Sequence, residues 1–163
     1  MKIAVISDTH GQIPESLPKA LAGANLILHL GDLGPSYLLY ELQTIAPVMA
    51  VQGNNDAPGQ AELPPLRRFS KSGVNFHLRH IPWSPSDLRK GPRPSIFLHG
   101  HTHRPEIRLL ETGYLLCPGA LTMPRGGFPS SYAWIVFEEG HCRFTIRSIS
   151  DRATIFEASW NLL

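Results

Sequence analysis

Apolar and polar residues in the first third of the chain follow one another in a pattern that predicts strands separated by helices. Three short apolar runs rich in β-branched residues are typical of buried strands and span residues 2–7, 25–30 and 47–52. Residues 13–23 and 36–45 show helical patterns, the second with Ser36 at its N-cap. Gly23 suits the end of the first helix, and Pro18 weakens it. This order predicts a parallel sheet with right-handed crossovers.

In the second half, turns that contain glycine divide apolar-rich runs, which is typical of antiparallel hairpins. The predicted hairpins span residues 66–80, 106–119 and 131–149, and a further strand is expected at residues 94–100. We therefore expect one α/β domain over residues 1–163, in which an early parallel half is extended by late hairpins.

Composition limits the class of protein. The chain has 163 residues, 42% hydrophobic and 17% charged, which fits one folded domain with a core. A formal net charge of +2 provides no strong field for nucleic acid or an anionic membrane, so neither partner is expected. Cys117 and Cys142 do not have the spacing of a metal-binding pair, and we expect both to be reduced thiols. With no signal-like or membrane-spanning run, we expect a soluble cytoplasmic protein.

Polar clusters follow the predicted strands. The clusters SDTHG, GDLG, GNND and GHTH come after four strands, and a lone histidine closes the run NFHLR. Because ligands bind at the carboxyl ends of strands in open α/β sheets, these loops are expected to converge. They would bring together Asp8, His10, Asp32, Asn54, His80, His101 and His103.

The stretch LHGHTHRP has three readings: a metal site, a proton-handling site, or a histidine-rich polar loop. Taken singly, Asp32 could neighbour a helix cap, Asn54 could belong to a turn, and His80 could be a bonded strand histidine. Four clusters in order at four strand ends favour a shared site. Gly31, Gly53 and Gly100 each precede a candidate ligand and would let the backbone approach closely.

The candidate ligands are carboxylates, imidazoles and one amide, with no thiolate. This set suits manganese, iron, cobalt, nickel or zinc. Seven side chains exceed the needs of one tetrahedral ion, but divide into two groups of four if one carboxylate bridges. Two ions ~3.5–4 Å apart could hold a hydroxide and clamp a phosphoester for in-line attack.

In this order, DTH, GD, GNND, the strand-end histidine and GHTH resemble the calcineurin-like metallophosphoesterase superfamily. The similarity is greatest to its small, single-domain YfcE-like branch, and it extends to the late segment CPGALTMPRGG. The resemblance implies a four-layer α/β/β/α sandwich of mixed sheets. It also implies hydrolysis of small phosphoesters, with a phosphodiesterase favoured over a phosphomonoesterase.

The resemblance assigns roles to single positions. One metal would take Asp8, His10 and His103, and the other would take Asn54, His80 and His101, with Asp32 bridging both. A hydroxide held by the metals would attack phosphorus, with Asp32 and Asn54 at the reacting centre. Manganese is the expected ion, with iron, nickel, cobalt or zinc as alternatives. The resemblance makes Asp56 a support for a neighbouring ligand.

Three positions depart from the family pattern. Asn55 stands where larger members carry a histidine, and an amide cannot act as a general acid, so weaker catalysis on poor leaving groups is expected. Ile81 replaces a glycine after His80 and could narrow the site. The proline-rich residues 84–95 are short, so we expect the crossover helix there to be truncated or replaced by a loop.

Other roles stay open. Arg125 could meet a substrate phosphate or lie on the surface, and Trp83 could line the pocket or cover the core. The main alternative to an enzyme is an interaction scaffold, since the superfamily includes a membrane-trafficking subunit with altered metal-site residues. A nuclease is disfavoured, because no interleaved basic and aromatic groove is visible in the sequence. The late hairpins could support a homodimer or a higher homo-oligomer.

Overall fold

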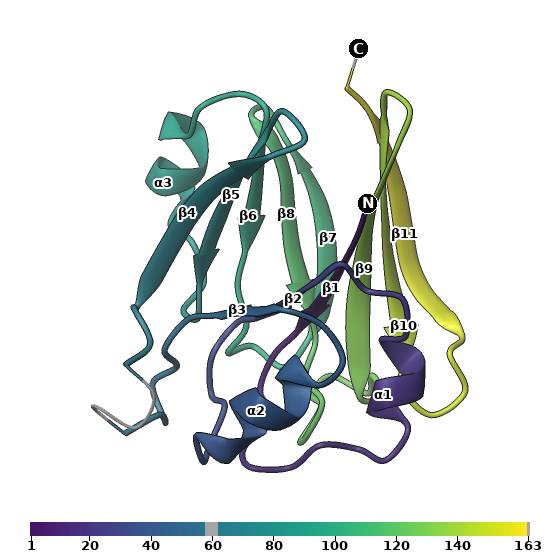
Figure 1. Cartoon of the computed structure of the whole chain (residues 1–163). Helices are drawn as coiled ribbons and strands as arrows, with labels where there is room; N and C mark the ends of the chain where they lie inside the picture. Colours follow the sequence, from purple (N-terminus) through teal and green to yellow (C-terminus); the bar gives the residue numbers. More distant parts are fainter. Residues whose placement is uncertain (58–61, 163) are drawn as a thin grey trace.

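Two β-sheets packed face to face form the body of the molecule (Figure 1). The structure is a computed structural model and describes residues 1–57 and 62–162. One sheet has six strands in the order β11-β10-β9-β1-β2-β3, and the other has five in the order β4-β5-β6-β8-β7.

The strand bounds follow the predicted runs closely. The six-stranded sheet contains β1 (Lys2–Ile6), β2 (Leu26–His29), β3 (Val48–Ala50), β9 (Ser131–Glu138), β10 (His141–Ser148) and β11 (Thr154–Asn161). The five-stranded sheet contains β4 (Leu66–Lys71), β5 (Val74–Arg79), β6 (Ser95–Leu98), β7 (Pro105–Leu110) and β8 (Gly113–Pro118). The helices are α1 (Leu17–Ala20), α2 (Tyr37–Gln43) and α3 (Pro85–Lys90).

The pairing confirms the predicted topology. β1, β2 and β3 run parallel, and the pairs β4–β5, β7–β8 and β9–β10 are antiparallel hairpins. β5 and β6 are parallel and are joined through α3, and β6 also pairs with β8 in parallel. The carboxyl ends of β1, β2 and β3 therefore meet at one edge of their sheet.

Successive side chains of a strand point to opposite faces of its sheet, so they pack in different layers of the molecule. Ile3 and Val5 of β1 pack between the two sheets with residues such as Phe76 and Ile96. Ala4 and Ile6 point the other way, towards leucines of α1 and α2. On the far side, Leu88 of α3 packs on Phe97 and Leu115. Helices thus cover the outer face of each sheet, which is the four-layer sandwich that the sequence predicts (Figure 1).

The helices are shorter than the sequence predicts. Residues 13–23 were expected to be helical, but α1 has only four residues; Pro18 lies in its first turn and bars helix before Leu17, and the helix ends before Gly23. Ser36 stands at the N-cap of α2, as predicted, but its side chain makes no capping hydrogen bond there. The truncation of the crossover helix is confirmed, because α3 has six residues, fixed at its start by a capping box between Ser84 and Asp87.

The sequence pattern missed β11, which forms the outer edge of the six-stranded sheet against β10. Its side chains are mostly exposed, so the strand carries no clear alternation of apolar and polar positions. Within the described residues, no helix is long and apolar enough to cross a membrane.

Candidate metal centre

The loops that carry the seven candidate ligands meet at the carboxyl ends of the strands. The backbone N–H of Asp8 donates to the carbonyl of Gly31 at 3.1 Å, and that of His10 donates to the carbonyl of Asp32 at 2.9 Å. In the five-stranded sheet, the N–H of Gly100 donates to the carbonyl of His80 at 3.0 Å, and across the two sheets the N–H of His101 donates to Asp8 Oδ2 at 3.3 Å. The convergence predicted from the strand order is therefore present.

Most of the candidate ligands share an unusual backbone conformation. Five of the seven have positive φ, between 44° and 66°: Asp8, His10, Asp32, His101 and His103. Aspartate and histidine tolerate this left-handed region better than most residues, yet each instance costs of order 1–3 kcal/mol. The loops are held there by the surrounding hydrogen bonds, which turns the side chains towards one point.

Two glycines allow the loops to come together. A Cβ at Gly53 would lie 2.0 Å from the backbone nitrogen of Asp32, and one at Gly31 would lie 2.8 Å from Gly53 Cα. Gly31 also has a φ of +93°, which other residues rarely adopt. The close approach predicted for these glycines is confirmed.

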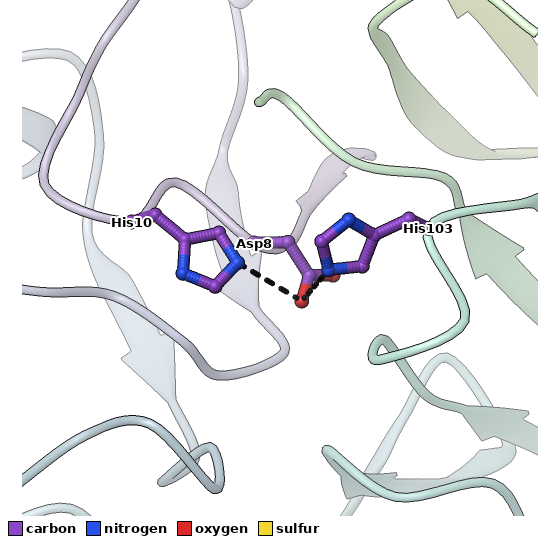
Figure 2. Close-up of side chains that lie close together, drawn as sticks. All are labelled: Asp8, His10 and His103. Atoms are coloured by element: carbon purple, nitrogen blue, oxygen red, sulfur yellow. Dashed lines mark ion pairs between the residues drawn. The ribbon is translucent and has the colours of Figure 1, made fainter. Parts of the chain in front are cut away.

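Asp8 is the hub of the site, and Figure 2 shows it between His10 and His103. Its Oδ1 lies 3.1 Å from His103 Nε2 and 4.0 Å from the Nε2 atoms of both His10 and His80. The side chain of Asp8 is fully buried. Asp8, His10 and His103 therefore offer three ligand atoms close enough to hold one ion.

A second group forms around Asp32. Asp32 Oδ2 lies 3.4 Å from His80 Nε2 and 3.7 Å from His10 Nε2, so this carboxylate stands between the two histidines. Asp8, Asp32 and His80 offer ligand atoms within reach of a second ion. The geometry places Asp8 in both groups, whereas the sequence-based assignment gives the bridging role to Asp32 alone.

Asn54 and His101 lie at the outer side of the site. His101 Nδ1 is 2.9 Å from Asn54 Oδ1, and the His101 ring stands edge-on to that of His80, with centroids 5.2 Å apart. These two residues line an open pocket of about 330 Å³. The other lining residues are His10, Asp32, Asn55, His103, Met123 and Arg125.

Backbone carbonyls orient two of the imidazoles. His80 Nδ1 lies 2.8 Å from the carbonyl oxygen of Leu30, and His103 Nδ1 lies 2.7 Å from that of Met123. An Nδ1–H that donates to a carbonyl leaves Nε2 with its lone pair facing the carboxylates, as a metal ligand requires. Sequence reasoning missed Met123, because a carbonyl contact carries no residue-type signal.

Asn55 and Asp56 support the ligands. The backbone N–H of Asn55 donates to Asp32 Oδ1 at 2.8 Å, and its side-chain amide donates to Asp32 Oδ2 at 2.7 Å. The Asp56 carboxylate accepts the N–H groups of Gly53 at 2.8 Å and Gly34 at 3.0 Å. Asp56 thus ties the loop of Asn54 to the loop of Asp32, which agrees with the supporting role expected for it.

The carboxyl groups of Asp8 and Asp32 have pKa values shifted in opposite directions. Burial raises the pKa of Asp8. Burial acts in the same sense on Asp32, but the His80 imidazole beside it and the hydrogen bonds from Asn55 outweigh burial and hold the Asp32 pKa well below its usual range. Burial opposes protonation of His80, but the Asp32 carboxylate beside it and the carbonyl of Leu30 raise its pKa above the usual value. A divalent cation would have to displace a proton here, so metal affinity is expected to fall at low pH.

His29 links the loop after β1 to the loop after β2. Its Nδ1 accepts the N–H of Gly31 at 3.2 Å, which leaves Nε2–H to donate to Thr9 Oγ1 at 2.9 Å. The Thr9 hydroxyl then donates to the carbonyl of Leu33 at 2.8 Å. His29 is completely buried, and burial lowers its pKa from 6.5 to about 4. It therefore acts as a neutral structural group.

His29 gives a testable pH dependence of stability. Above pH 6.5 it is neutral in both the folded and the unfolded chain, so it has no effect. As the pH falls towards 4, only the unfolded chain takes up the proton, and the free energy of unfolding drops by roughly 3 kcal/mol. Denaturant titrations at pH 7 and pH 4 in chelator should show this loss in wild type and not in His29→Gln. Equal losses in both proteins would contradict the assignment.

Comparison with known proteins identifies the family. A sequence model of the calcineurin-like phosphoesterase superfamily domain matches residues 1–140. The chain belongs to this superfamily. It is 40% identical over 142 residues to a probable metallophosphoesterase of Methanothermobacter thermautotrophicus, a match that covers 80% of this chain and 83% of that protein.

Two further proteins are similar to this chain, one in sequence and fold and the other in fold. The phosphodiesterase YfcE of Escherichia coli K12 is 29% identical over 160 residues, covering 83% of this chain and 87% of YfcE. A solved YfcE structure superimposes with a TM-score of 0.79 at 24% identity, covering 97% and 98% of the two chains. Vps29 of Entamoeba histolytica, solved in complex with Zn²⁺, has a TM-score of 0.78 at 20% identity over the full length of both chains.

The site fits the divalent metals that calcineurin-like phosphoesterases use. Asp8 Oδ1, His10 Nε2 and His80 Nε2 are buried atoms without a hydrogen-bond partner among the described residues. Burying unpaired polar atoms is costly, so three of them facing one point are suited to bind a cation. The donor set of imidazole nitrogens and carboxylate oxygens suits such an ion.

The structure answers the questions that the sequence leaves open at Ile81 and Trp83. Ile81 is 47% exposed and does not line the metal pocket, so His80 keeps its place beside Asp32. Trp83 packs on Phe97 behind the second sheet and donates its indole N–H to the Leu98 carbonyl. Trp83 therefore covers the core, and of its two readings the structural one is confirmed.

Proposed function

We propose that this protein is a metal-dependent phosphodiesterase that hydrolyses small phosphoesters with two divalent ions. The observation that carries the proposal is the set of buried, unpartnered ligand atoms around Asp8 and Asp32. The naming of YfcE as a phosphodiesterase supports the preference for diesters.

The ligand assignment is part of the proposal. One ion is held by Asp8, His10 and His103, and the other by His80, Asn54 and His101. Asp32 bridges the two, and Asp8 Oδ1 lies near enough to both groups to share that role. Manganese is the proposed ion. Divalent ions bound there supply Lewis-acid activation of water and stabilise the charge that develops on the phosphoryl oxygens.

The protein's own residues position the reaction. Asn55 holds the Asp32 carboxylate with two hydrogen bonds, and the carbonyls of Leu30 and Met123 fix the rings of His80 and His103. Asn54 and His101 form the wall where a phosphoester enters.

Substrate contact falls to Arg125, at the mouth of the site. Its backbone N–H donates to the His103 carbonyl at 3.0 Å, so the loop that carries it is tied to a ligand loop. Its guanidinium can bind a phosphate oxygen bidentately. We therefore assign Arg125 to substrate binding.

Truncation of Asn55 to alanine removes the side-chain bond to Asp32 and keeps the backbone one. We expect metal affinity or turnover to fall by ~10–100-fold, the usual cost of losing a residue that orients a metal ligand. Asn25→Ala is the matched control, since the Asn25 side chain accepts the backbone N–H of Lys2 and does not line the pocket. Metal titrations followed by turnover would measure the difference, and equal behaviour of the two variants would remove Asn55 from the site.

Assays on an activated aryl phosphodiester and its monoester counterpart test the function. The proposal predicts turnover that requires added manganese, is abolished by chelator, and is faster on the diester. A folded protein with no turnover and no metal uptake would instead favour an interaction scaffold. Faster turnover of the monoester would keep the metal site and overturn the diester preference.

The setting of the reaction follows from the same proposal. We place the enzyme in the cytoplasm, in keeping with two buried free cysteines, Cys117 and Cys142. Its substrate is a small phosphoester, with no membrane or nucleic-acid partner at the metal centre. Homodimer formation stays a prediction, and exposed Leu109 and Phe156 lie on late strands where it would occur.

A further inference from the structure

A second pocket lies on the outer face of the six-stranded sheet. It has a volume of about 350 Å³ and is lined by residues of β1, α1, β9, β10 and the turn after β10. Five of its side chains are basic: Lys2, Lys19, Arg143, Arg147 and Arg152. We call this set the outer basic groove. Among the described residues, none lines both this groove and the metal pocket.

Strand register explains why these residues meet. Side chains alternate along β10, so Arg143, Thr145 and Arg147 share one face. They stand opposite Val136, Trp134 and Tyr132 of β9, respectively, and Lys2 of β1 stands on the other side of Val136. The single turn of α1 packs on Ala4, Ile6 and Tyr132, and it leaves Trp134 and Val136 half-buried. The short helix therefore leaves a basic floor with an aromatic surface open.

The charge of the groove is largely unmatched. Glu138, the acidic lining residue, pairs with Arg143 at 3.7 Å. Within residues 1–57 and 62–162, the side chains of Lys2, Lys19, Arg147 and Arg152 make no ion pair. Another carboxylate, Glu157, stands opposite Thr145 on β11 but does not line the groove.

Arg147 gives the most direct sign of a ligand. Its Nε is buried and has no hydrogen-bond partner among the described residues. A partly buried guanidinium with no paired charge is costly, and an anion bound beside it in the groove would lower that cost. Guanidinium groups match phosphate oxygens in geometry and bind them bidentately.

From these observations we propose that the outer basic groove binds a ligand with several phosphate groups in series. Four unmatched cations exceed the charge of one phosphate, whereas a triphosphate chain supplies enough charge and fits the groove volume. Such a chain can be inorganic or can belong to a nucleotide whose base lies on Trp134. This site is separate from the metal centre and does not depend on the proposed activity.

Calorimetric titration of the full-length protein with tripolyphosphate and with ATP tests the proposal. Both should bind wild type, and Arg147→Gln and Lys19→Gln should each weaken binding by about ten-fold. Binding at the metal centre is common to all these proteins, so the difference between them reports the groove. Arg108→Gln is the matched control, because Arg108 lies on β7 outside the groove and should keep wild-type affinity.

The two sources of the phosphate chain are separable. Tighter binding of ATP, with the gain lost in Trp134→Leu, would identify a nucleotide, and equal affinities would identify the phosphate chain alone. No binding to wild type, or equal binding to wild type and both groove variants, would overturn the proposal. Binding of a single-stranded oligothymidylate when both triphosphates fail would also overturn it. Turnover of the aryl phosphodiester should be unchanged in Arg147→Gln, which keeps this test apart from that of the metal centre.

Discussion

Replacement of Asp32 by asparagine is expected to lower turnover by more than about 100-fold, beyond the cost of losing a residue that only supports a ligand. Asp32 Oδ2 stands between His80 and His10, and its carboxylate is kept ionised by the hydrogen bonds of Asn55 and the nearby imidazole of His80. Asparagine has almost the same shape, but it lacks the negative charge and places an amide where a carboxylate oxygen would bind a cation. Steady-state turnover of an aryl phosphodiester with added manganese measures the effect.

Asp151→Asn is the matched control for this change. Asp151 carries the same charge but lies exposed after β10, where it accepts the N–H of Ala153 at 3.0 Å. Turnover of this variant should equal that of wild type. Retention of turnover by Asp32→Asn would contradict a bridging role for this carboxylate.

A single methyl group at Gly53 is expected to disrupt the site almost as strongly. The Cβ of Gly53→Ala would lie 2.0 Å from Asp32 N and 2.1 Å from Asp32 Oδ1. Because backbone lies in the way, the loop that carries Asp32 must move. We expect a loss of ~1–3 kcal/mol in the free energy of unfolding, typical of overpacking, and near-complete loss of turnover.

Gly73→Ala separates the loss of stability from the loss of the site. Gly73 has a φ of +76° and no atom within 4 Å of an added Cβ, so alanine there costs ~1–2 kcal/mol of stability through backbone strain alone. Its turnover at a temperature where both variants are folded should remain that of wild type. Similar activities of the two variants would mean that the approach of Gly53 to Asp32 is not required.

The sequence predicted the parts of this fold whose signals are local. Buried strands such as β1 are continuous apolar runs, and the turn at Ser72 and Gly73 ends one run and begins another, so strands and hairpins could be placed. The candidate ligands could be named because each polar cluster follows a strand. The extent of α1 could not be predicted, because Pro18 limits where that helix begins and the sequence pattern does not show where it ends.

Features that depend on residues far apart in the sequence could not be predicted from it. The left-handed backbone of Asp8 and Asp32, and the carbonyl that orients His103, arise only when loops from different strands meet. The outer basic groove is built from segments far apart in the chain, so Trp134 and Arg147 become neighbours only through strand register. No linear pattern of basic and aromatic residues marks it.

Counting bound metal tests the central claim most directly. The protein, purified without chelator and dialysed against manganese, is analysed by elemental mass spectrometry together with Asp8→Asn, which changes the residue common to both ligand groups. Two ions per chain in wild type, with a marked loss in the variant, is the result that a dinuclear site predicts. No ion, or one ion, per folded wild-type chain would contradict it.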